Sequence, residues 1–189
     1  MVPDTEGGFT KLYPEEKVMP VYDAVVEYKK RGTNLVIIGG KEYGTGSSRD
    51  WAAKGTKLLG VKVVIAGKEY GTGSSRDWAA KGTKLLGIKL VIAESFERIH
   101  RSNLIGMGIL PLQFIDRMNK SNLKFIGSEL ISVVNLEKGI APSEHVEVEI
   151  KYHSGDVKKI KTLCRIDTKN ELEYYKNGGI LQYVLRNMI

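Results

Sequence analysis

The chain carries one 27-residue unit twice in succession: residues 40–66 read GKEYGTGSSRDWAAKGTKLLGVKVVIA, and residues 67–93 read GKEYGTGSSRDWAAKGTKLLGIKLVIA. The copies differ only by two conservative apolar exchanges, Val61 for Ile88 and Val63 for Leu90. Solenoid proteins need three or more units, and their copies usually drift apart in sequence. We therefore interpret the repeat as a tandem duplication within a single domain, residues 1–189, and expect one copy to be surplus.

Each copy predicts a turn, a helix and a strand. The first copy turns at residues 43–46 and should form a helix over about 47–59, stopped by Gly60, and then a buried strand over 61–66. The second copy repeats this plan, with a helix over 74–86 and a strand over 88–93. Strands that alternate with crossover helices favour a parallel sheet of the α/β class.

The flanking segments predict further elements of the same sheet. The apolar run Leu35–Ile38 is typical of a strand covered on both faces. Alternating apolar residues over 146–152 and 160–166 predict an antiparallel hairpin with one wet face. The remaining expected elements are a helix over 20–31 stopped by Gly32, a short helix capped by Ser95 and running through His100, a strand over 108–114, and terminal helices over 170–176 and 180–187.

Composition excludes several classes of protein. The sequence has 189 residues, a net charge of +7 and a single cysteine, Cys164. One cysteine forms no internal disulfide, which favours a reducing, cytoplasmic location, and it cannot hold an iron–sulfur cluster or a zinc ion, so we expect no cofactor in this chain. The sequence contains neither a secretory signal nor an apolar run long enough to cross a membrane. The lysines are scattered, so the charge indicates a solvated surface rather than a dedicated nucleic-acid site.

The Gly-Ser-Ser-Arg turn is the segment of each copy best suited to chemistry. Glycines that lead from a strand into a helix let backbone N–H groups converge, and the helix dipole adds positive charge there, which suits an anion. Ser47 with Asp50 could equally form a capping box that only starts the helix, leaving Arg49 solvated. A dinucleotide fingerprint and a Walker loop both fail, because neither the third glycine nor a Gly-Lys-Ser/Thr run is present.

Three longer strings carry a family resemblance. KEYGTGSSRDWAAKG, AESFERIHRSNLIGMGILPLQF and GGILQYVLRNMI closely resemble the C-terminal swivel domain of aconitate hydratases of the bacterial and iron-regulatory-protein type. The likeness covers the whole chain apart from one surplus copy of the unit. It implies a swivelling β/β/α domain with a parallel sheet, crossover helices and a C-terminal antiparallel hairpin, which closes over three other domains that hold a [4Fe–4S] cluster.

The resemblance also implies roles for the Ser-Ser-Arg runs. The first serine, Ser47 or Ser74, would be the catalytic base, and the second, Ser48 or Ser75, would hydrogen-bond the substrate. The arginine, Arg49 or Arg76, would clamp a substrate carboxylate. Outside this set we expect structural or surface roles for His100, His145 and His153, and we favour such a role over substrate contact for Arg98 and Arg101.

The resemblance implies the substrate-clamping domain of an enzyme of the tricarboxylic acid cycle that interconverts citrate and isocitrate through cis-aconitate. The domain would be inactive alone, and its partners would be a tricarboxylate and the cluster-bearing domains. Three other readings stay open: a separate small subunit like that of isopropylmalate isomerase, which docks on a large subunit; an RNA-binding fragment of an iron-regulatory-like protein; and a duplicated chain without independent function. We expect one copy, with the second favoured, to take the native position and the other to be looped out or added as an extra βα unit. The strand of the surplus copy should then hide at a sheet edge or in self-association.

Overall fold

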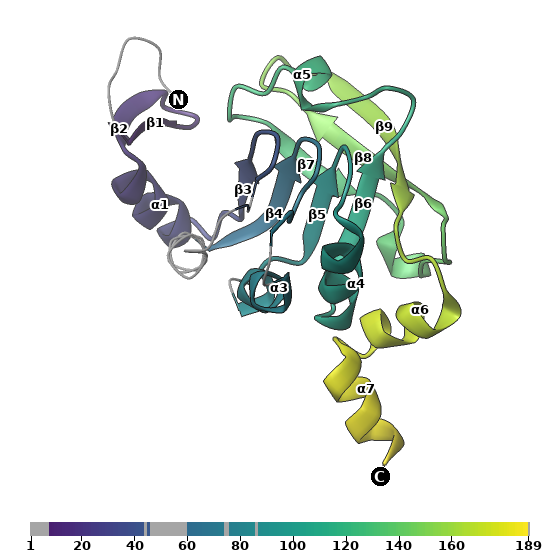
Figure 1. Cartoon of the computed structure of the whole chain (residues 1–189). Coiled ribbons are helices and arrows are strands. Elements are labelled where there is room, and N and C mark those ends of the chain that lie inside the picture. The colour runs from purple at the N-terminus through teal and green to yellow at the C-terminus, as the bar shows by residue number, and fades with distance from the viewer. Residues whose placement is uncertain (1–7, 44, 46–59, 74–75, 86, 189) are drawn as a thin grey trace.

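The computed structural model describes residues 8–43, 45, 60–73, 76–85 and 87–188. These residues form a seven-stranded sheet with helices around it, and a two-stranded sheet lies beside α1 near the N-terminus (Figure 1). The elements follow in the order β1 (Phe9–Leu12), β2 (Lys17–Pro20), α1 (Val21–Lys30), β3 (Leu35–Ile38), β4 (Val61–Ala66), α3 (Arg76–Leu85), β5 (Leu90–Ala93), α4 (Arg98–Gly106), β6 (Leu110–Phe114), α5 (Lys120–Leu123), β7 (Leu130–Val133), the 3-10 turn η1 (Leu136–Lys138), β8 (His145–Lys151), β9 (Val157–Cys164), α6 (Lys169–Lys176) and α7 (Ile180–Asn187).

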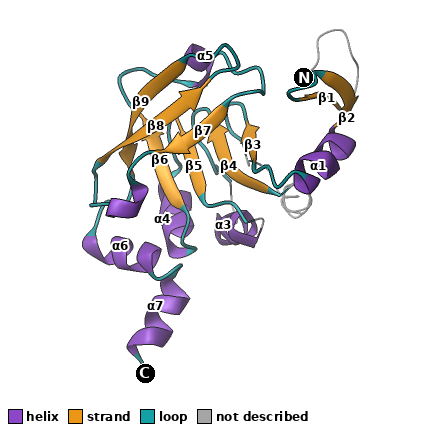
Figure 2. Ribbon diagram, turned by 180° about the vertical axis from the view of Figure 1, so that it is seen from behind, coloured by secondary structure: helices purple, strands orange, loops and turns teal. Residues whose placement is uncertain are grey.

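The large sheet combines a parallel half with an antiparallel half. Its strand order is β3-β4-β5-β6-β9-β8-β7. Strands β3 to β6 pair in parallel, whereas β6–β9, β9–β8 and β8–β7 pair antiparallel. The expected α/β class and the C-terminal hairpin are therefore confirmed. The sheet curls strongly (Figure 2), and residues of its two edge strands, β3 and β7, line a common cleft.

The two copies enter the sheet as neighbouring strands in matching register. Each of the last four residues of β4 pairs with the residue 27 positions later in β5, as Val63 does with Leu90 and Ala66 with Ala93. The same spacing pairs Val36 of β3 with Val63. The added copy thus widens the sheet by one strand. An added unit, rather than a looped-out copy, is one of the two placements we expected, and the strand order agrees with it. The expectation that its strand hides at a sheet edge or by self-association is wrong, because both β4 and β5 are hydrogen-bonded on both sides within the sheet.

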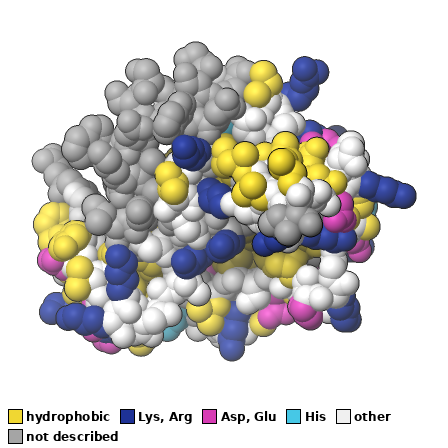
Figure 3. Space-filling model, turned by 90° about the horizontal axis from the view of Figure 1, so that it is seen from below, with side chains coloured by type: hydrophobic (Ala, Val, Ile, Leu, Met, Phe, Trp, Pro, Cys, Tyr) yellow, Lys and Arg dark blue, Asp and Glu magenta, His cyan; other side chains and the backbone are white. Residues whose placement is uncertain are grey.

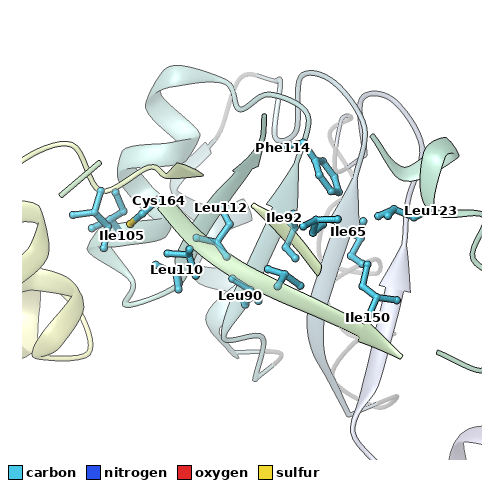
Figure 4. Packing of buried hydrophobic residues seen from close by; sticks show 14 residues of the cluster. Ile65, Leu90, Ile92, Ile105, Leu110, Leu112, Phe114, Leu123, Ile150 and Cys164 are labelled. Atoms are coloured by element: carbon cyan, nitrogen blue, oxygen red, sulfur yellow. The ribbon is translucent and has the colours of Figure 1, made fainter. Parts of the chain in front are cut away.

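The core has two parts because successive residues of a strand point to opposite faces. Ile65 and Ile92 pack into a cluster with the hairpin residue Ile150, which Figure 4 shows from close by. The residues that precede them in the two strands, Val64 and Val91, pack on the other face of the sheet, together with Ala80 of α3 and Leu104 of α4. Both faces of β4 and β5 are therefore covered, which accounts for their continuous apolar sequence.

Strand β3 departs from the prediction of burial on both faces. It lies at the edge of the sheet, and Ile38 keeps 42% of its surface exposed. Gly32 follows α1 as expected, with φ of +68°. Gly60 has φ of +67°, but the helix expected before it, over 47–59, lies outside the described residues. Gly87 (φ +80°) donates its N–H to the carbonyl of Lys84.

The C-terminal helix α7 projects from the body of the molecule (Figure 1). Seen from the end where α7 lies, hydrophobic side chains gather into a patch with Lys and Arg side chains around it (Figure 3). The exposed large apolar side chains of this helix and the residue after it are Ile180, Leu181, Val184, Leu185 and Met188. Among the described helices, none has the length and apolarity needed to span a lipid bilayer.

Candidate functional site

The repeated turns lie side by side where parallel strands end. We name residues 39–45, which follow β3, the first turn, and residues 67–73, which follow β4, the second turn. Because β3 and β4 are parallel neighbours, both turns emerge at the same edge of the sheet. Hydrogen bonds tie them together: Gly67 N–H donates to the Gly40 carbonyl at 3.0 Å, and Glu42 N–H donates to the Lys68 carbonyl at 2.9 Å.

The described parts of the two turns share a backbone shape. Glu42 and Glu69, which are equivalent in the two copies, both adopt the left-handed region, with φ of +56° and +57°. This region is uncommon for a residue with a side chain. The rings of Tyr43 and Tyr70 stack at 6.1 Å with an interplanar angle of 9°. The duplication therefore repeats a local conformation as well as a sequence.

The second turn is held on its other side by the segment that follows β5. Tyr70 N–H donates to the Ser95 carbonyl at 3.0 Å, and Glu97 N–H donates to the Tyr70 carbonyl at 3.1 Å. The hydroxyl of Ser95 accepts a hydrogen bond from Glu69 N–H at 2.8 Å. The Tyr70 ring also meets Phe96 edge-on, with the centroids 5.9 Å apart.

These contacts overturn the prediction that Ser95 caps a helix. The segment leaving β5 stays extended and forms a parallel bridge between Tyr70 and Phe96, so α4 begins only at Arg98. Glu97 is the N-cap, and its carboxylate accepts a hydrogen bond from His100 N–H at 2.8 Å. The Ser95 hydroxyl is instead hydrogen-bonded to the second turn. Helix α4 continues beyond His100 to Gly106.

Tyr70 is the buried centre of the second turn. Only 4% of its surface is exposed. Burial raises the pKa of its hydroxyl well above the ordinary value, and a hydrogen bond with Thr83 of α3 only partly offsets this. The phenol therefore stays neutral and serves as a fixed link between the turn and the helix that follows it.

The turns carry both signs of charge. Lys41 Nζ lies 3.1 Å from the carboxylate of Glu42. The hydrogen bond with Glu42, helped by the charges of Glu42 and Glu69, raises the pKa of Lys41. The ammonium group is therefore maintained beside the sheet edge where an anion would approach.

Most of the expected site residues lie outside the described part of the chain: Ser47, Ser48, Arg49, Ser74 and Ser75. Of the set only Arg76 is placed, by its backbone, as the first residue of α3. The second turn thus runs from the end of β4 towards the N-terminus of a ten-residue helix. Free N–H groups and the dipole at such a helix end favour an anion.

The remaining histidines and arginines lie in different surroundings. His145 and His153 are exposed, whereas His100 is buried with 2% of its surface accessible. Arg98 is exposed at the start of α4. A substrate role is disfavoured for Arg101, because its guanidinium binds both carboxylate oxygens of Glu171, at 2.9 and 3.1 Å.

The described residues do not fit a metal or an iron–sulfur cluster. No three or more His, Cys, Asp or Glu side chains among them gather closely enough to bind a metal ion. Cys164 is buried in the core, and burial raises the pKa of its thiol, which disfavours the thiolate that clusters require.

Comparison with known proteins defines the class. The family model of the aconitase C-terminal domain matches residues 1–67 and 62–117, so the chain belongs to the aconitase C-terminal domain family. Each of the two matches contains one copy of the repeated unit, as a duplication within one domain would produce.

Curated relatives in this family are longer proteins. The chain is 53% identical over 188 residues to aconitate hydratase A of Legionella pneumophila and 47% identical over 189 residues to that of Pseudomonas aeruginosa. Each match covers 100% of this chain but only 18% of the relative. A solved structure of 3-isopropylmalate dehydratase from Methanocaldococcus jannaschii has the same fold, with a TM-score of 0.53 at 23% identity over 82% of this chain and 93% of the other.

Proposed function

We propose that this chain is the substrate-clamping domain of an aconitate hydratase, which binds a tricarboxylate and works together with cluster-bearing domains. One observation carries the proposal: in a chain of the aconitase C-terminal domain family, the second turn runs from the end of a parallel strand towards a helix N-terminus. That arrangement suits the recognition of a small carboxylate by backbone N–H groups. A cytoplasmic location belongs to the same proposal.

The proposed roles follow the order of residues in the turn. The first serine, Ser47 or Ser74, removes the substrate proton, and the second, Ser48 or Ser75, hydrogen-bonds the substrate. The arginine, Arg49 or Arg76, binds a substrate carboxylate through its planar fork. A serine hydroxyl is a weak base in water, so it needs a site closed from solvent in which donors stabilise its alkoxide.

A [4Fe–4S] cluster belongs, in this proposal, to protein outside this chain. The single Cys164 and the absence of a metal-binding group among the described residues exclude a cluster site there. A cluster of this kind supplies a Lewis acid for the leaving hydroxyl. We therefore expect the isolated chain to show no citrate–isocitrate interconversion, and measurable turnover by the purified chain would contradict this division of labour.

The anion site is testable without the missing domains. Citrate titrated into the 189-residue chain and followed by calorimetry should bind with a Kd of about 1 mM, or about −4 kcal/mol. The double variant Arg49→Ala/Arg76→Ala should weaken binding at least several-fold. Lys158→Ala/Lys159→Ala on β9 removes the same charge and serves as the control. Equal binding by wild type and the arginine variant would place the anion elsewhere.

A second reading is an independent small subunit that docks on a separate cluster-bearing subunit. The likeness of fold to the 3-isopropylmalate dehydratase structure favours it, because this chain covers 93% of that shorter chain. Affinity purification of the tagged chain from its own cell extract separates the two readings. A co-purifying iron–sulfur protein supports a separate large subunit, whereas a single longer polypeptide that contains these residues supports the first reading. A salt-dependent gel shift with an RNA hairpin tests the RNA-binding reading.

A further inference from the structure

The two copies of the turn have the same residues, so their chemistry alone does not distinguish them. Their surroundings do. The first turn follows an edge strand, and the second follows an interior strand whose far neighbour, β5, leads into α4. A turn that presents converging N–H groups binds an anion best when its backbone is already held in place, because less freedom is lost on binding.

The second turn is held by α4 as well as by the segment before it. The rings of Tyr70 and His100 lie 5.2 Å apart. A Cβ atom on Gly71 would lie only 2.0 Å from Cδ2 of His100, so the backbone of the turn rests directly against the buried imidazole. His100 therefore limits the position of Gly71 in the second turn.

The helix after the second turn is anchored to the rest of the domain. Ala80 is fully buried and Thr83 is 7% exposed. Lys84, in the last turn of α3, donates a hydrogen bond to the carbonyl of Gly178, between α6 and α7. Through the Thr83–Tyr70 hydrogen bond, turn and helix are joined to each other. The C-terminal half of α3 is thus fixed relative to α4 and the C-terminal helices.

The first turn is hydrogen-bonded to the second turn and stacks against it. It takes hydrogen-bond partners from Gly67, Lys68 and Gly71 of the second turn, and its Tyr43 stacks on Tyr70 while remaining only half-buried. Its strand β3 ends in Ile38, which is 42% exposed. The described residues of the first turn are therefore held in part by the second turn.

We propose that the second turn, residues 67–73, together with the start of α3, is the tricarboxylate-binding turn. His100 is its positioning residue, and the first turn is the surplus copy. This assignment rests on the proposed function and names which of two sequence-identical sites performs it. It follows from the neighbours of each turn, which the duplication made unequal.

The duplication supplies a matched pair of variants for the test. Arg49→Glu and Arg76→Glu make the same change 27 positions apart in identical local sequences. We expect citrate to bind Arg76→Glu at least 10-fold more weakly than wild type, and Arg49→Glu within 2-fold of wild type. Equal weakening by both, or weakening by Arg49→Glu alone, overturns this inference and leaves the proposed function standing. If wild type binds no citrate, or if neither variant weakens binding, the proposed function and this inference fail together.

The positioning role of His100 has its own readout. His100→Ala should weaken citrate binding at least 3-fold at a temperature where circular dichroism shows the protein fully folded. Leu104→Ala, a fully buried position on the same helix, should lower the unfolding midpoint without changing the citrate Kd. An unchanged Kd in His100→Ala, or an equal loss of affinity in Leu104→Ala, overturns the positioning role.

Discussion

Replacement of Gly71 by alanine should be among the most damaging single changes in this chain. Gly71 has a φ of +83°, where a Cβ atom costs about 1–2 kcal/mol. The new Cβ would also lie 2.0 Å from Cδ2 and 2.3 Å from Cγ of His100. The imidazole is 2% exposed and packed against Tyr70, so it has little room to retreat, and overpacking of this kind costs about 1–3 kcal/mol. The sum is about 3 kcal/mol.

Gly155→Ala separates the two contributions. Gly155 has a similar φ, +90°, but no atom lies within 4 Å of the position its Cβ would take. This control should therefore lose only about 1 kcal/mol. In urea unfolding with a slope of about 2 kcal/mol per M, Gly71→Ala should lower the midpoint by about 1.5 M and Gly155→Ala by about 0.5 M. Equal shifts in the two variants would refute the direct contact between the second turn and His100.

Further predictions concern the rest of the domain. Arg101→Ala should lower the free energy of unfolding by about 3 kcal/mol because it strands the partly buried carboxylate of Glu171, whereas the exposed Lys176→Ala should change it by less than about 0.5 kcal/mol. Burial alone would raise the pKa of Glu171, but hydrogen bonds from Arg101 and the backbone outweigh this and lower it. The resulting stability is present near neutral pH and lost as pH falls through that lowered pKa, so acid titration should cost wild type more stability than Glu171→Gln. Cys164 should react with a thiol reagent only at the rate of unfolding, since burial raises its pKa; fast labelling of the native protein would contradict this. Deletion of either copy of the repeated unit should leave a folded chain, and the two products should differ by at most about 1.6 kcal/mol, the value of two buried methylenes; loss of folding in both would contradict a surplus copy.

Much of the sheet could be predicted because its signals are local. Leu35–Ile38 and Val61–Ala66 are strands with the expected bounds, and Ile180–Asn187 is a helix with the expected bounds. Apolar runs ended by glycines mark such elements without any knowledge of their neighbours. The strands β1 and β7 were missed because each has only four residues and little burial, so neither gives a clear alternation of apolar and polar residues.

The candidate site could be predicted less completely because its support is non-local. Sequence reasoning identified the Gly-Ser-Ser-Arg turn as chemically suited to an anion, yet gave no sign that His100, about thirty positions along the chain, touches Gly71. It also assigned Ser95 to a helix cap, although the hydroxyl accepts a bond from Glu69 in the turn. One feature of the sequence, the repeat length, could have predicted that the two turns lie together. When two units of equal length join one parallel sheet, their equivalent residues lie side by side.

The register of the repeat explains why the fold accepts a second copy. A strand added at a sheet edge needs new partners, but β4 pairs with β5 through the same 27-residue spacing that pairs β3 with β4, so the added unit reuses contacts that the sheet already makes. The cost is geometric. One inserted strand moves everything before it outward by about 4.8 Å and twists it by about 20–25° relative to everything after it. Relative to a domain with one copy, β1, β2, α1 and β3 would be displaced in this way from α4, the hairpin and the C-terminal helices, because they precede the inserted strand. The second turn would keep its contact with α4. A partner that contacts the C-terminal part of the domain would therefore still meet the proposed anion-binding turn in the expected position, and the displaced N-terminal elements would be the part it fails to fit.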